Sequence, residues 1–499
     1  MPDFPLRSIV VVGGGNTGWL AAATLARIIG SSCPVRVVTL PEDLAVDGAI
    51  ASVPSLHGML RLLRIDEAAL MRATGATFRL GAMFRDWSAL GDRYFNGYGV
   101  FGATLDAVPF QHHWLRQAAT GDRKGFEEFS MAAHLARLDR FALPQSDPRS
   151  VFSLYSYAWH FDSGLLAAFL RECALKAGVV EIVGDVESVT LDSADGNIRD
   201  IVLKDSSRVA GDLFIDCSGA RAVLGAALGS VNEDWSAWLP CDRMQSLRSG
   251  PANRLSPYSE TVADTAGWHS SIPLQHCTVK AHTYCSELTS DDDIEAKLAA
   301  AASGGVSHGS RVQRLIRGRP KEFWVRNCLL MPGETIDPLD GTALHLAQSG
   351  ITRFLAHFPV SRSSPTDMAE YNRLTADEYD RLRDLLVLHY HATRRSDSEF
   401  WNRRREMSVP DSLARRLALY ADSGRITAAE NEHCGADGWV FVLLGQGLLP
   451  ISYDPLVEAM PLATARRALA GINAEMRRRA AAAPVHRDFI AQCGASRPS

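Results

Sequence analysis

The sequence predicts an α/β fold with a Rossmann-like core and a helical second part. A short apolar strand, Ile9 to Val12, runs directly into a glycine-rich turn, and a second apolar strand, Val35 to Leu40, follows one helix later. From Thr375 onward the apolar residues recur at helical spacing, and the polar faces are rich in arginine. The early strands and helix indicate a parallel sheet, and the later helices indicate a subdomain packed against it.

The glycine-rich turn has the G-x-G-x-x-G pattern of a dinucleotide-binding loop. Gly13 permits the tight turn, Gly15 lets the backbone approach a pyrophosphate, and Gly18 lets helix and strand pack closely. The helix over residues 20–29 directs its partial positive charge toward the phosphates. An ordinary glycine turn is the alternative. The predicted cofactor-binding residues here are Gly13, Gly15, Asn16, Thr17 and Gly18.

The second strand lacks the acidic residue that normally ends it in a dinucleotide fold. An Asp or Glu roughly 20 residues beyond the glycines usually binds the ribose hydroxyls. This strand ends at Thr39 and Leu40. The nearest acids, Glu42 and Asp43, lie beyond Pro41. The sequence therefore leaves open how a ribose is held.

Strands return in the middle of the chain. Three runs, 179–183, 186–191 and 198–204, are separated by turn signals, which predicts a small sheet. Residues 211–216 are typical of a buried strand that leads through small residues into a glycine. Such a strand allows close approach to a cofactor, although a buried strand with a tight exit turn would look the same. The further predicted cofactor-binding residues are Val186 and Asp216.

Composition argues against two classes of partner. The 499 residues carry a formal net charge of -5 and are 46% hydrophobic and 22% charged, as in an ordinary soluble enzyme. No broad basic field is expected, so we predict no nucleic-acid partner. No window approaches the ~18 apolar residues of a membrane span, and no secretory segment precedes the first strand. We therefore predict no membrane partner and a cytoplasmic location.

Cysteine and histidine usage argues against disulfides and metals. The nine cysteines are scattered singly without a C-x-x-C motif, and the fifteen histidines form no H-E-x-x-H motif. An odd number of cysteines without ligand spacing fits reduced thiols. The sequence predicts no metal site.

The ordered segments taken together resemble the flavin-dependent tryptophan halogenases over most of the chain, from Ile9 to about Pro450. The matching segments are Gly13–Trp19, Pro109–Arg116, Trp159–Asp162, Gly211–Gly219, Trp268, Ile272–Pro273, Asp337–Leu339, His389–Tyr390, Phe400–Trp401 and Gly445–Pro450. The resemblance implies an FAD-binding Rossmann-like core of the flavin monooxygenase type, with a helical pyramid that holds an aromatic substrate.

The extent of this resemblance implies a domain organisation in which residues 1–450 form one catalytic unit, with a cofactor-binding part and a helical part interleaved. Residues 451–499 are expected to form a C-terminal helical segment with a loosely held tail after Val485.

The resemblance also implies a chemistry. In that family a separate flavin reductase supplies FADH2, which reacts with oxygen, and chloride or bromide is oxidised to hypohalous acid. The acid travels through an internal passage to a lysine, which presents electrophilic halogen to an indole carbon while a glutamate assists. FAD, as FADH2, and a halide ion are therefore the expected cofactors.

The positions of that lysine and that glutamate differ in this chain. Arg79 stands at the lysine position, and a guanidinium, with a pKa above ~12, cannot readily form a haloamine. Arg79 can still donate hydrogen bonds to hypohalous acid, or it is a structural ion-pair arginine. Asp340 stands at the glutamate position on a shorter stem. Thr342 matches a threonine beside the family's halide and flavin site, and Ala343 replaces the glycine after it.

Other positions of the resemblance are also changed. Ser270 replaces the second tryptophan of the W-x-W-x-I-P signature, and Ile50 replaces the acid of a strap that touches the flavin region. His112 matches a histidine of the family's substrate pocket and is predicted to bind substrate or transfer a proton, with a structural role as the alternative. His160 and Asp162 are interpreted as architecture, with Asp162 capping the next helix.

Three functional hypotheses remain at this point. The first is a halogenase acting on tryptophan, an indole or another electron-rich aromatic, with Arg79, Asp340 and His112 as its catalytic residues. The second is a flavin-dependent monooxygenase that hydroxylates an aromatic, suggested by the changes at Arg79 and Ser270. The third is a non-catalytic scaffold that has lost halogenation.

Overall fold

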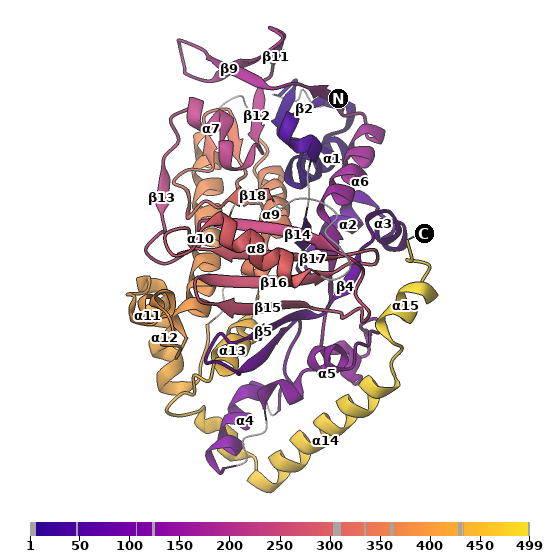
Figure 1. Ribbon diagram of the computed structural model, residues 1–499, viewed down its shortest axis with the longest axis vertical. Helices are drawn as coiled ribbons and strands as arrows, with labels where there is room; N and C mark the ends of the chain where they lie inside the picture. Colours follow the sequence, from indigo (N-terminus) through magenta and orange to yellow (C-terminus); the bar gives the residue numbers. More distant parts are fainter. Residues whose placement is uncertain are drawn as a thin grey trace.

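The computed structural model of this chain is an α/β protein built around a parallel sheet. The residues it describes are 6–45, 48–105, 107–121, 125–302, 311–333, 336–359, 364–427, 432 and 434–497. Figure 1 shows the parallel sheet at one end of the molecule and a second large sheet across its middle, with several helices at the other end. None of the described helices is long and apolar enough to span a membrane.

The parallel sheet contains six strands in the order β20-β21-β12-β1-β2-β8. These strands are β1 (Ile9–Val12), β2 (Val35–Thr39), β8 (Val180–Val183), β12 (Leu213–Asp216), β20 (Trp324–Val325) and β21 (Cys328–Leu330). Strand β1 lies between β12 and β2, and its four residues are fully buried, which explains their unbroken apolar run. The carboxyl ends of these three parallel strands therefore meet at one edge of the sheet.

Helix α1 (Asn16–Ile29) continues directly from the glycine turn. It packs against α6 (Ser163–Lys176) and α9 (Ala343–Ala356). Its small alanine side chains are buried, which lets the neighbouring helices approach closely. The predicted strand, turn, helix and strand unit is confirmed.

The strands after residue 179 are arranged differently from the expectation. Strands β9 (Val186–Leu191), β10 (Ile198–Leu203) and β11 (Arg208–Ala210) form a three-stranded sheet of their own. The prediction that 179–183 belongs to this small sheet was wrong, because β8 pairs in parallel with β2. Strand β8 follows helix α6, and a strand after a crossover helix can return in parallel to the sheet that the helix covers.

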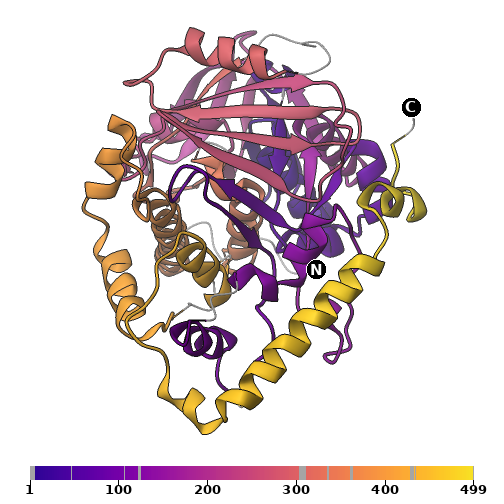
Figure 2. The same cartoon turned by 60° about the horizontal axis from the view of Figure 1, so that its bottom comes forward.

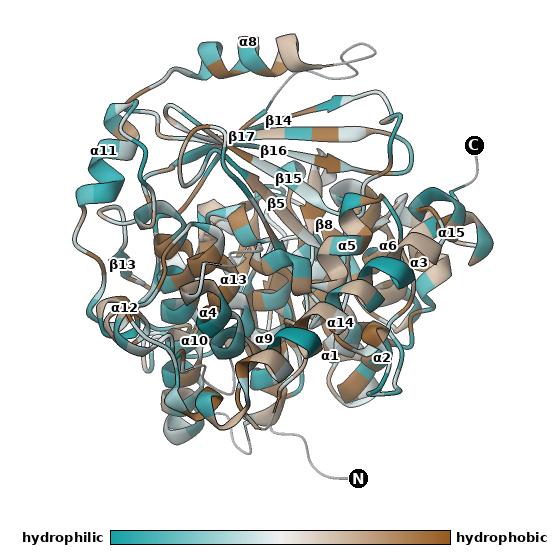
Figure 3. Cartoon of the chain, turned by 90° about the horizontal axis from the view of Figure 1, so that it is seen from below, coloured by the Kyte–Doolittle hydropathy of each residue, from teal (hydrophilic) through white to brown (hydrophobic). Residues whose placement is uncertain are grey.

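The second large sheet has seven strands in the order β18-β14-β17-β16-β15-β5-β6. They are β5 (Gly81–Arg85), β6 (Arg93–Gly97), β14 (Arg243–Ser249), β15 (Ser259–Asp264), β16 (Gly267–Pro273), β17 (Thr278–Tyr284) and β18 (Arg311–Arg314). Helix α8 (Asp291–Ala301) lies on one face of it (Figure 3), where Ile294 and Leu298 pack with Leu247 and Tyr284. The opposite face of this sheet lines a pocket, which is described below.

A small sheet of three strands carries the predicted site residue Arg79 and the changed strap position Ile50. Strand β7 (Ala158–Asp162) is fully buried and pairs antiparallel with both β3 (Ala49–Ala51) and β4 (Thr77–Arg79). Asp162 ends β7 and its carboxylate accepts a hydrogen bond from the Leu165 amide at the start of α6. The predicted helix cap is confirmed.

The remaining helices are distributed over both parts of the molecule. They are α2 (Leu56–Leu63), α3 (Glu67–Thr74), α4 (Phe110–Ala119), α5 (Met131–Arg137), α7 (Val223–Ala227), α10 (Pro365–His391), α11 (Glu399–Glu406), α12 (Asp411–Ser423), α13 (Ala436–Gly445), α14 (Leu462–Ala482) and α15 (His486–Gln492). Two short strands, β13 (Asn232–Asp234) and β19 (Gly318–Pro320), pair with each other. Figure 2 shows α14 running diagonally along the molecule toward the C-terminus.

The C-terminal segment corrects the expectation of a loosely held tail. Helix α15 is anchored by His486, whose Nδ1 donates to the Leu255 carbonyl (2.8 Å) while Nε2 accepts from the Phe78 amide (3.2 Å). Burial lowers the pKa of His486 to about 4, which keeps the ring neutral and able to accept. Ile490 is 2% exposed and belongs to the main core cluster. Apolar side chains at helical spacing, rather than position near the end, decide whether a segment docks.

We predict that Ile490→Ala lowers the free energy of unfolding by about 2–4 kcal/mol, because it leaves a cavity under α15. Chemical denaturation followed by circular dichroism measures this change. The matched control is Ile451→Ala, since Ile451 is 89% exposed and should lose almost nothing. Equal stability of the two variants would mean that α15 is not docked in solution.

Candidate active site

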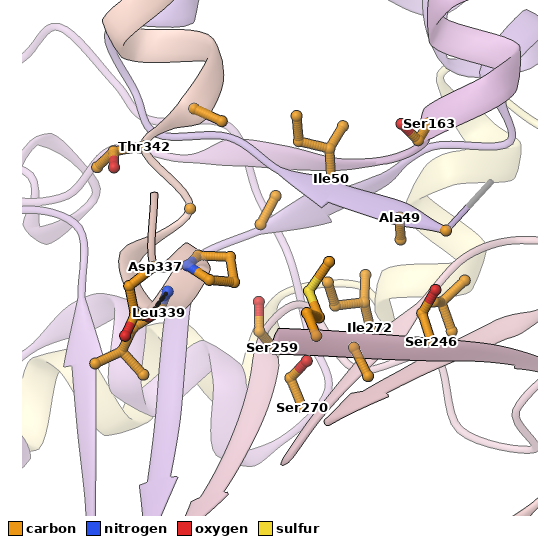
Figure 4. Close-up of a pocket in the computed structure, with 18 of the residues that line it drawn as sticks. Ala49, Ile50, Ser163, Ser246, Ser259, Ser270, Ile272, Asp337, Leu339 and Thr342 are labelled. Atoms are coloured by element: carbon orange, nitrogen blue, oxygen red, sulfur yellow. Dashed lines mark hydrogen bonds between the residues drawn. The ribbon is translucent and has the colours of Figure 1, made fainter. Parts of the chain in front are cut away.

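A pocket lies between strand β3 and the face of the seven-stranded sheet opposite α8 (Figure 4). Ser246 lines it while the next residue, Leu247, packs beneath α8, because alternate residues of a strand point to opposite faces. Residues 336–339 and 341–343 form a further wall. The labelled lining residues are Ala49, Ile50, Ser163, Ser246, Ser259, Ser270, Ile272, Asp337, Leu339 and Thr342.

The glycine turn at the edge of the parallel sheet is tightly constrained. Gly13 has a φ of 112°, and a Cβ built there would overlap the Cys217 carbonyl. A Cβ on Gly18 would overlap the carbonyl oxygen of Gly13. Gly15 is the residue directly before α1. Because it has no side chain, it does not cap the first amides of the helix. Such amides bind anions readily.

Two carboxylates lie near the end of β2: Asp43, which the sequence places beyond Pro41, and Glu181, which the sequence analysis did not connect with this strand. The Asp43 Oδ2 accepts from the amides of Gly14 (2.5 Å) and Leu40 (2.9 Å). The Thr39 hydroxyl donates to Glu181 on neighbouring β8 (2.9 Å). Burial raises the pKa of Asp43, although the two amide hydrogen bonds oppose that shift. One carboxylate thus lies in the turn after β2 and the other on the adjacent strand, and both are bound to groups of this chain.

Asn16 connects the glycine turn with the pocket. Its Nδ2 donates to the hydroxyl of Ser163 (2.8 Å), which lines the pocket. Its Oδ1 is fully buried and has no hydrogen-bond partner among the described residues. A buried acceptor without a partner fits a bound molecule that donates a hydrogen bond at this point. The turn and Asn16 therefore suit a dinucleotide.

Arg79 lies at the end of β4 and lines the pocket with 2% exposure. Its Nε donates to the Ser259 hydroxyl (3.1 Å), and its Nη1 donates to the Ser52 carbonyl (2.7 Å) and to the hydroxyl of Tyr98. No described residue accepts a hydrogen bond from its Nη2. A buried guanidinium held in one place by neutral acceptors has a donor left for an occupant of the pocket.

Tyr98 joins Arg79 and Asp340 into one cluster. The Tyr98 hydroxyl also donates to the Ser52 carbonyl (3.1 Å), and the Arg79 guanidinium lies 5.3 Å from the centre of the Tyr98 ring. Burial raises the pKa of Tyr98, Arg79 lowers it and Asp340 raises it further. Asp340 also affects Tyr94 and His389 and is absent from the pocket lining. Arg79, which lines the pocket, and Asp340, which does not, thus both influence the Tyr98 hydroxyl electrostatically.

Thr342 lies where helix α9 meets the pocket. It is 4% exposed, and both Thr342 and Ala343 line the pocket at the N-terminus of this 14-residue helix. The helix end supplies partial positive charge there. Ser270 also lines the pocket, and its short side chain leaves space that a tryptophan side chain would fill. This region can hold an anion beside a planar ligand.

Three predicted site residues lie away from this cluster. His112 on α4 accepts through Nδ1 a hydrogen bond from the Asp454 amide (3.3 Å) and is absent from the pocket lining. Val186 is buried in a core cluster with Val12 and Val38. Asp216 accepts from the amides and hydroxyl that shape the loop after β12, including Ser218 and Leu224. The predicted functional roles of these three stay predictions.

One side-chain group has the composition of a metal site. Asp162, His276 and Cys277 have ligand atoms within 4.8 Å of one another. The Arg248 guanidinium already pairs with Asp162, and its Nη1 lies 3.8 Å from the Cys277 sulfur. Asp162 raises the pKa of His276 to about 9, so the histidine is a cation at neutral pH. Two cations around one carboxylate make an ion-pair cluster.

The structure also brings into the site two residues that the sequence analysis did not single out for chemistry. Asp337 lines the pocket, and Tyr98 binds Arg79, which lines it. No local motif marks either residue. The sequence signal available for Asp337 was the family match of Asp337–Leu339, which drew attention to Asp340 instead. The partners that define both residues, Arg79 and Tyr390, lie 19 and 53 positions away along the chain.

Comparison with known proteins agrees with this architecture. Residues 8–462 match the family model described as tryptophan halogenase. The chain is 27% identical to tryptophan 6-halogenase SttH of Streptomyces toxytricini, with 97% of this chain and 98% of that protein covered.

Solved structures are similar along the whole chain. BrvH, a flavin-dependent halogenase from Brevundimonas sp. BAL3, has a TM-score of 0.93 at 35% identity and covers 98% of this chain and 99% of its own. Xcc4156, a flavin-dependent halogenase from Xanthomonas campestris, has a TM-score of 0.94 at 35% identity, with 99% of each chain covered. The chain therefore belongs to the tryptophan halogenase family of flavin-dependent oxidoreductases, which combine an FAD-binding Rossmann-like core with a substrate-binding subdomain.

Proposed function

We propose that this protein uses FADH2, oxygen and a halide to halogenate tryptophan, another indole or a related electron-rich aromatic. The observation that carries the proposal is the cluster of Arg79, Tyr98 and Asp340, of which Arg79 lines the pocket, in a chain of this family. The net reaction consumes FADH2, O2, a halide ion, a proton and the aromatic C–H, and gives FAD, the aryl halide and two molecules of water.

The cofactor is held by residues that suit it. The first amides of α1 and the glycines of the turn would bind the pyrophosphate, and Asn16 would accept a hydrogen bond through Oδ1. When bound in its reduced form, FAD supplies the two electrons that activate oxygen. Thr342 and the N-terminus of α9 would hold the halide.

Arg79 would hold and orient the oxidised halogen species. Since its guanidinium cannot lose a proton readily, it would act by hydrogen bonding through Nη2 rather than as a haloamine. Asp340 would accept the proton that the aromatic ring loses when the carbon–halogen bond forms. His112 is proposed to contribute to the substrate side through its Nε2, because its Nδ1 is already bound.

The proposed partners are a separate flavin reductase and a small aromatic substrate. The nine cysteines are free, as expected in a reducing compartment. We therefore place the reaction in the cytoplasm, where the reductase would supply reduced flavin. Asp216 and Val186 are proposed to support the cofactor indirectly, through the loop after β12 and the core beneath β9.

The proposed halogenation can be tested directly in a reconstituted reaction. Purified protein mixed anaerobically with FADH2, then with oxygen, bromide and a panel of indoles, should give products with the bromine isotope doublet in the mass spectrum. Products must be absent when bromide, FADH2 or protein is omitted. A halide-independent product carrying oxygen-18 from O2 would instead indicate hydroxylation, and firm flavin binding without any product would indicate a scaffold.

The glycine turn gives a second prediction. Gly18→Ala should weaken FAD binding at least about tenfold, because the added methyl group would overlap the Gly13 carbonyl and displace α1. Flavin fluorescence titration measures the affinity. Gly471→Ala on α14 is the matched control, because no atom lies within 4 Å of its Cβ. Unchanged affinity of Gly18→Ala would place the flavin elsewhere.

Arg79 and Asp340 give a third prediction. Arg79→Gln should lower the bromination rate about 100-fold or more, because a charged donor to the halogen species is lost. Asp340→Asn should lower it by a similar factor through loss of the base. Arg79→Lys should retain activity, because the charge stays. FAD affinity measured in parallel should be unchanged, and full activity of Arg79→Gln would show that Arg79 is only structural.

A further inference from the structure

Asp337 is a second acidic residue beside the pocket, and the proposed function does not use it. It directly precedes the short 3-10 helix of Pro338–Asp340 and lines the pocket, whereas Asp340 does not. Figure 4 shows it on the wall that also carries Leu339 and Thr342. Its side chain is 4% exposed, so it meets the pocket from an almost wholly buried position.

Asp337 is held by a directed chain of hydrogen bonds. The Leu339 amide donates to its Oδ1 (3.1 Å), and the Tyr390 hydroxyl donates to its Oδ2 (2.6 Å). The indole N–H of Trp268 donates in turn to the Tyr390 oxygen (2.9 Å). Trp268 can only donate, so the phenolic proton of Tyr390 has two acceptors, the Asp337 oxygen at 2.6 Å and the more distant Cys241 sulfur at 3.6 Å. The retained first tryptophan of the W-x-W-x-I-P signature therefore orients an acid in the pocket wall.

The charges around Asp337 leave it without a counter-ion. Among the described residues, no Lys, Arg or His lies within ion-pair distance of its carboxylate. The groups that face it are Tyr390 from α10 and Cys241 from the segment before β14, which lies 3.6 Å from the Tyr390 oxygen. Arg79 faces the same pocket from β4, and Arg404 from α11 lies behind Tyr390 and Cys241.

Burial without a cation changes the acidity of this group. Burial raises the pKa of Asp337 to about 6, and the hydrogen bonds from Tyr390 and Leu339 hold it below the value that burial alone would give. The carboxyl group is therefore mostly neutral below pH 6 and mostly ionised above it. An ionised Asp337 repels an anion in the pocket, and a neutral one does not.

We propose that Asp337 is the group that gains and loses a proton in response to negative charge bound in this pocket, and that Tyr390 and Trp268 are its positioning residues. The inference rests on the proposed function, since the anions concerned are reduced flavin and halide. When an anion binds, the carboxylate takes up one proton from bulk solvent, which reaches it through water in the pocket. When the anion leaves, the O–H bond breaks, the proton returns to water, and the Tyr390 and Leu339 donors again stabilise the carboxylate.

The test is the midpoint potential of bound FAD as a function of pH, measured in the holoenzyme without substrate. Asp337→Asn keeps the size of the side chain and removes its charge. At pH 5 the potentials of wild type and variant should coincide. At pH 8 the wild type should prefer oxidised over reduced FAD about tenfold more than the variant does, which is about 30 mV for a two-electron couple.

Two further variants complete the experiment. Tyr390→Phe removes a donor to the carboxylate, raises the pKa of Asp337 and should move the pH at which the curves separate upward. If Asp337→Asn does not fold, the pH profile of Tyr390→Phe alone tests the inference. Asp384→Asn on α10, a buried acid paired with Arg383 outside the pocket, is the matched control and should follow the wild type.

Identical pH profiles for wild type and Asp337→Asn would overturn the inference, as would a constant offset at every pH. The expected profile without bromination would refute the proposed function and leave the inference standing. Bromination with identical profiles would support the proposed function and overturn the inference. A wild-type protein that binds no FAD would overturn both.

Discussion

Strand β7 is the element on which the rest of the pocket depends. It is buried along its whole length and hydrogen-bonds on one side to β3, which forms the roof of the pocket, and on the other to β4, which ends in Arg79. Its last residue, Asp162, caps α6, whose first residue, Ser163, binds Asn16 after the glycine turn. The register of a single strand therefore sets the roof, the cation and the link to the cofactor loop relative to one another.

The features that could be predicted from the sequence are local. The glycine turn needs only a strand, the spacing of Gly13, Gly15 and Gly18, and the helix after them, all within some twenty consecutive residues. The helix cap at Asp162 depends on an amide three residues away. Such signals survive because the physical cause and the residues lie side by side in the chain.

The rest depends on contacts between distant segments. The carboxylate of Glu181 reaches the end of β2 only because β8 returns to the main sheet, and the sequence around 179–183 does not distinguish that pairing from pairing with β9. Arg79 acquires its geometry from Ser52, Tyr98 and Ser259. Candidate residue types were identifiable, but their partners were not, because side-chain direction follows from tertiary packing. The docked tail was missed for the same reason.

The anchoring of α15 links the end of the chain to the pocket. His486 binds the amide of Phe78, the residue directly before Arg79, and Phe489 packs edge-on against the Phe78 ring. Strand β4 therefore lacks part of its support until residue 490 has been added. During synthesis the wall that carries the guanidinium is therefore completed only after α15 has been made. Completion of this wall of the pocket thus depends on the order in which the segments of the chain are made.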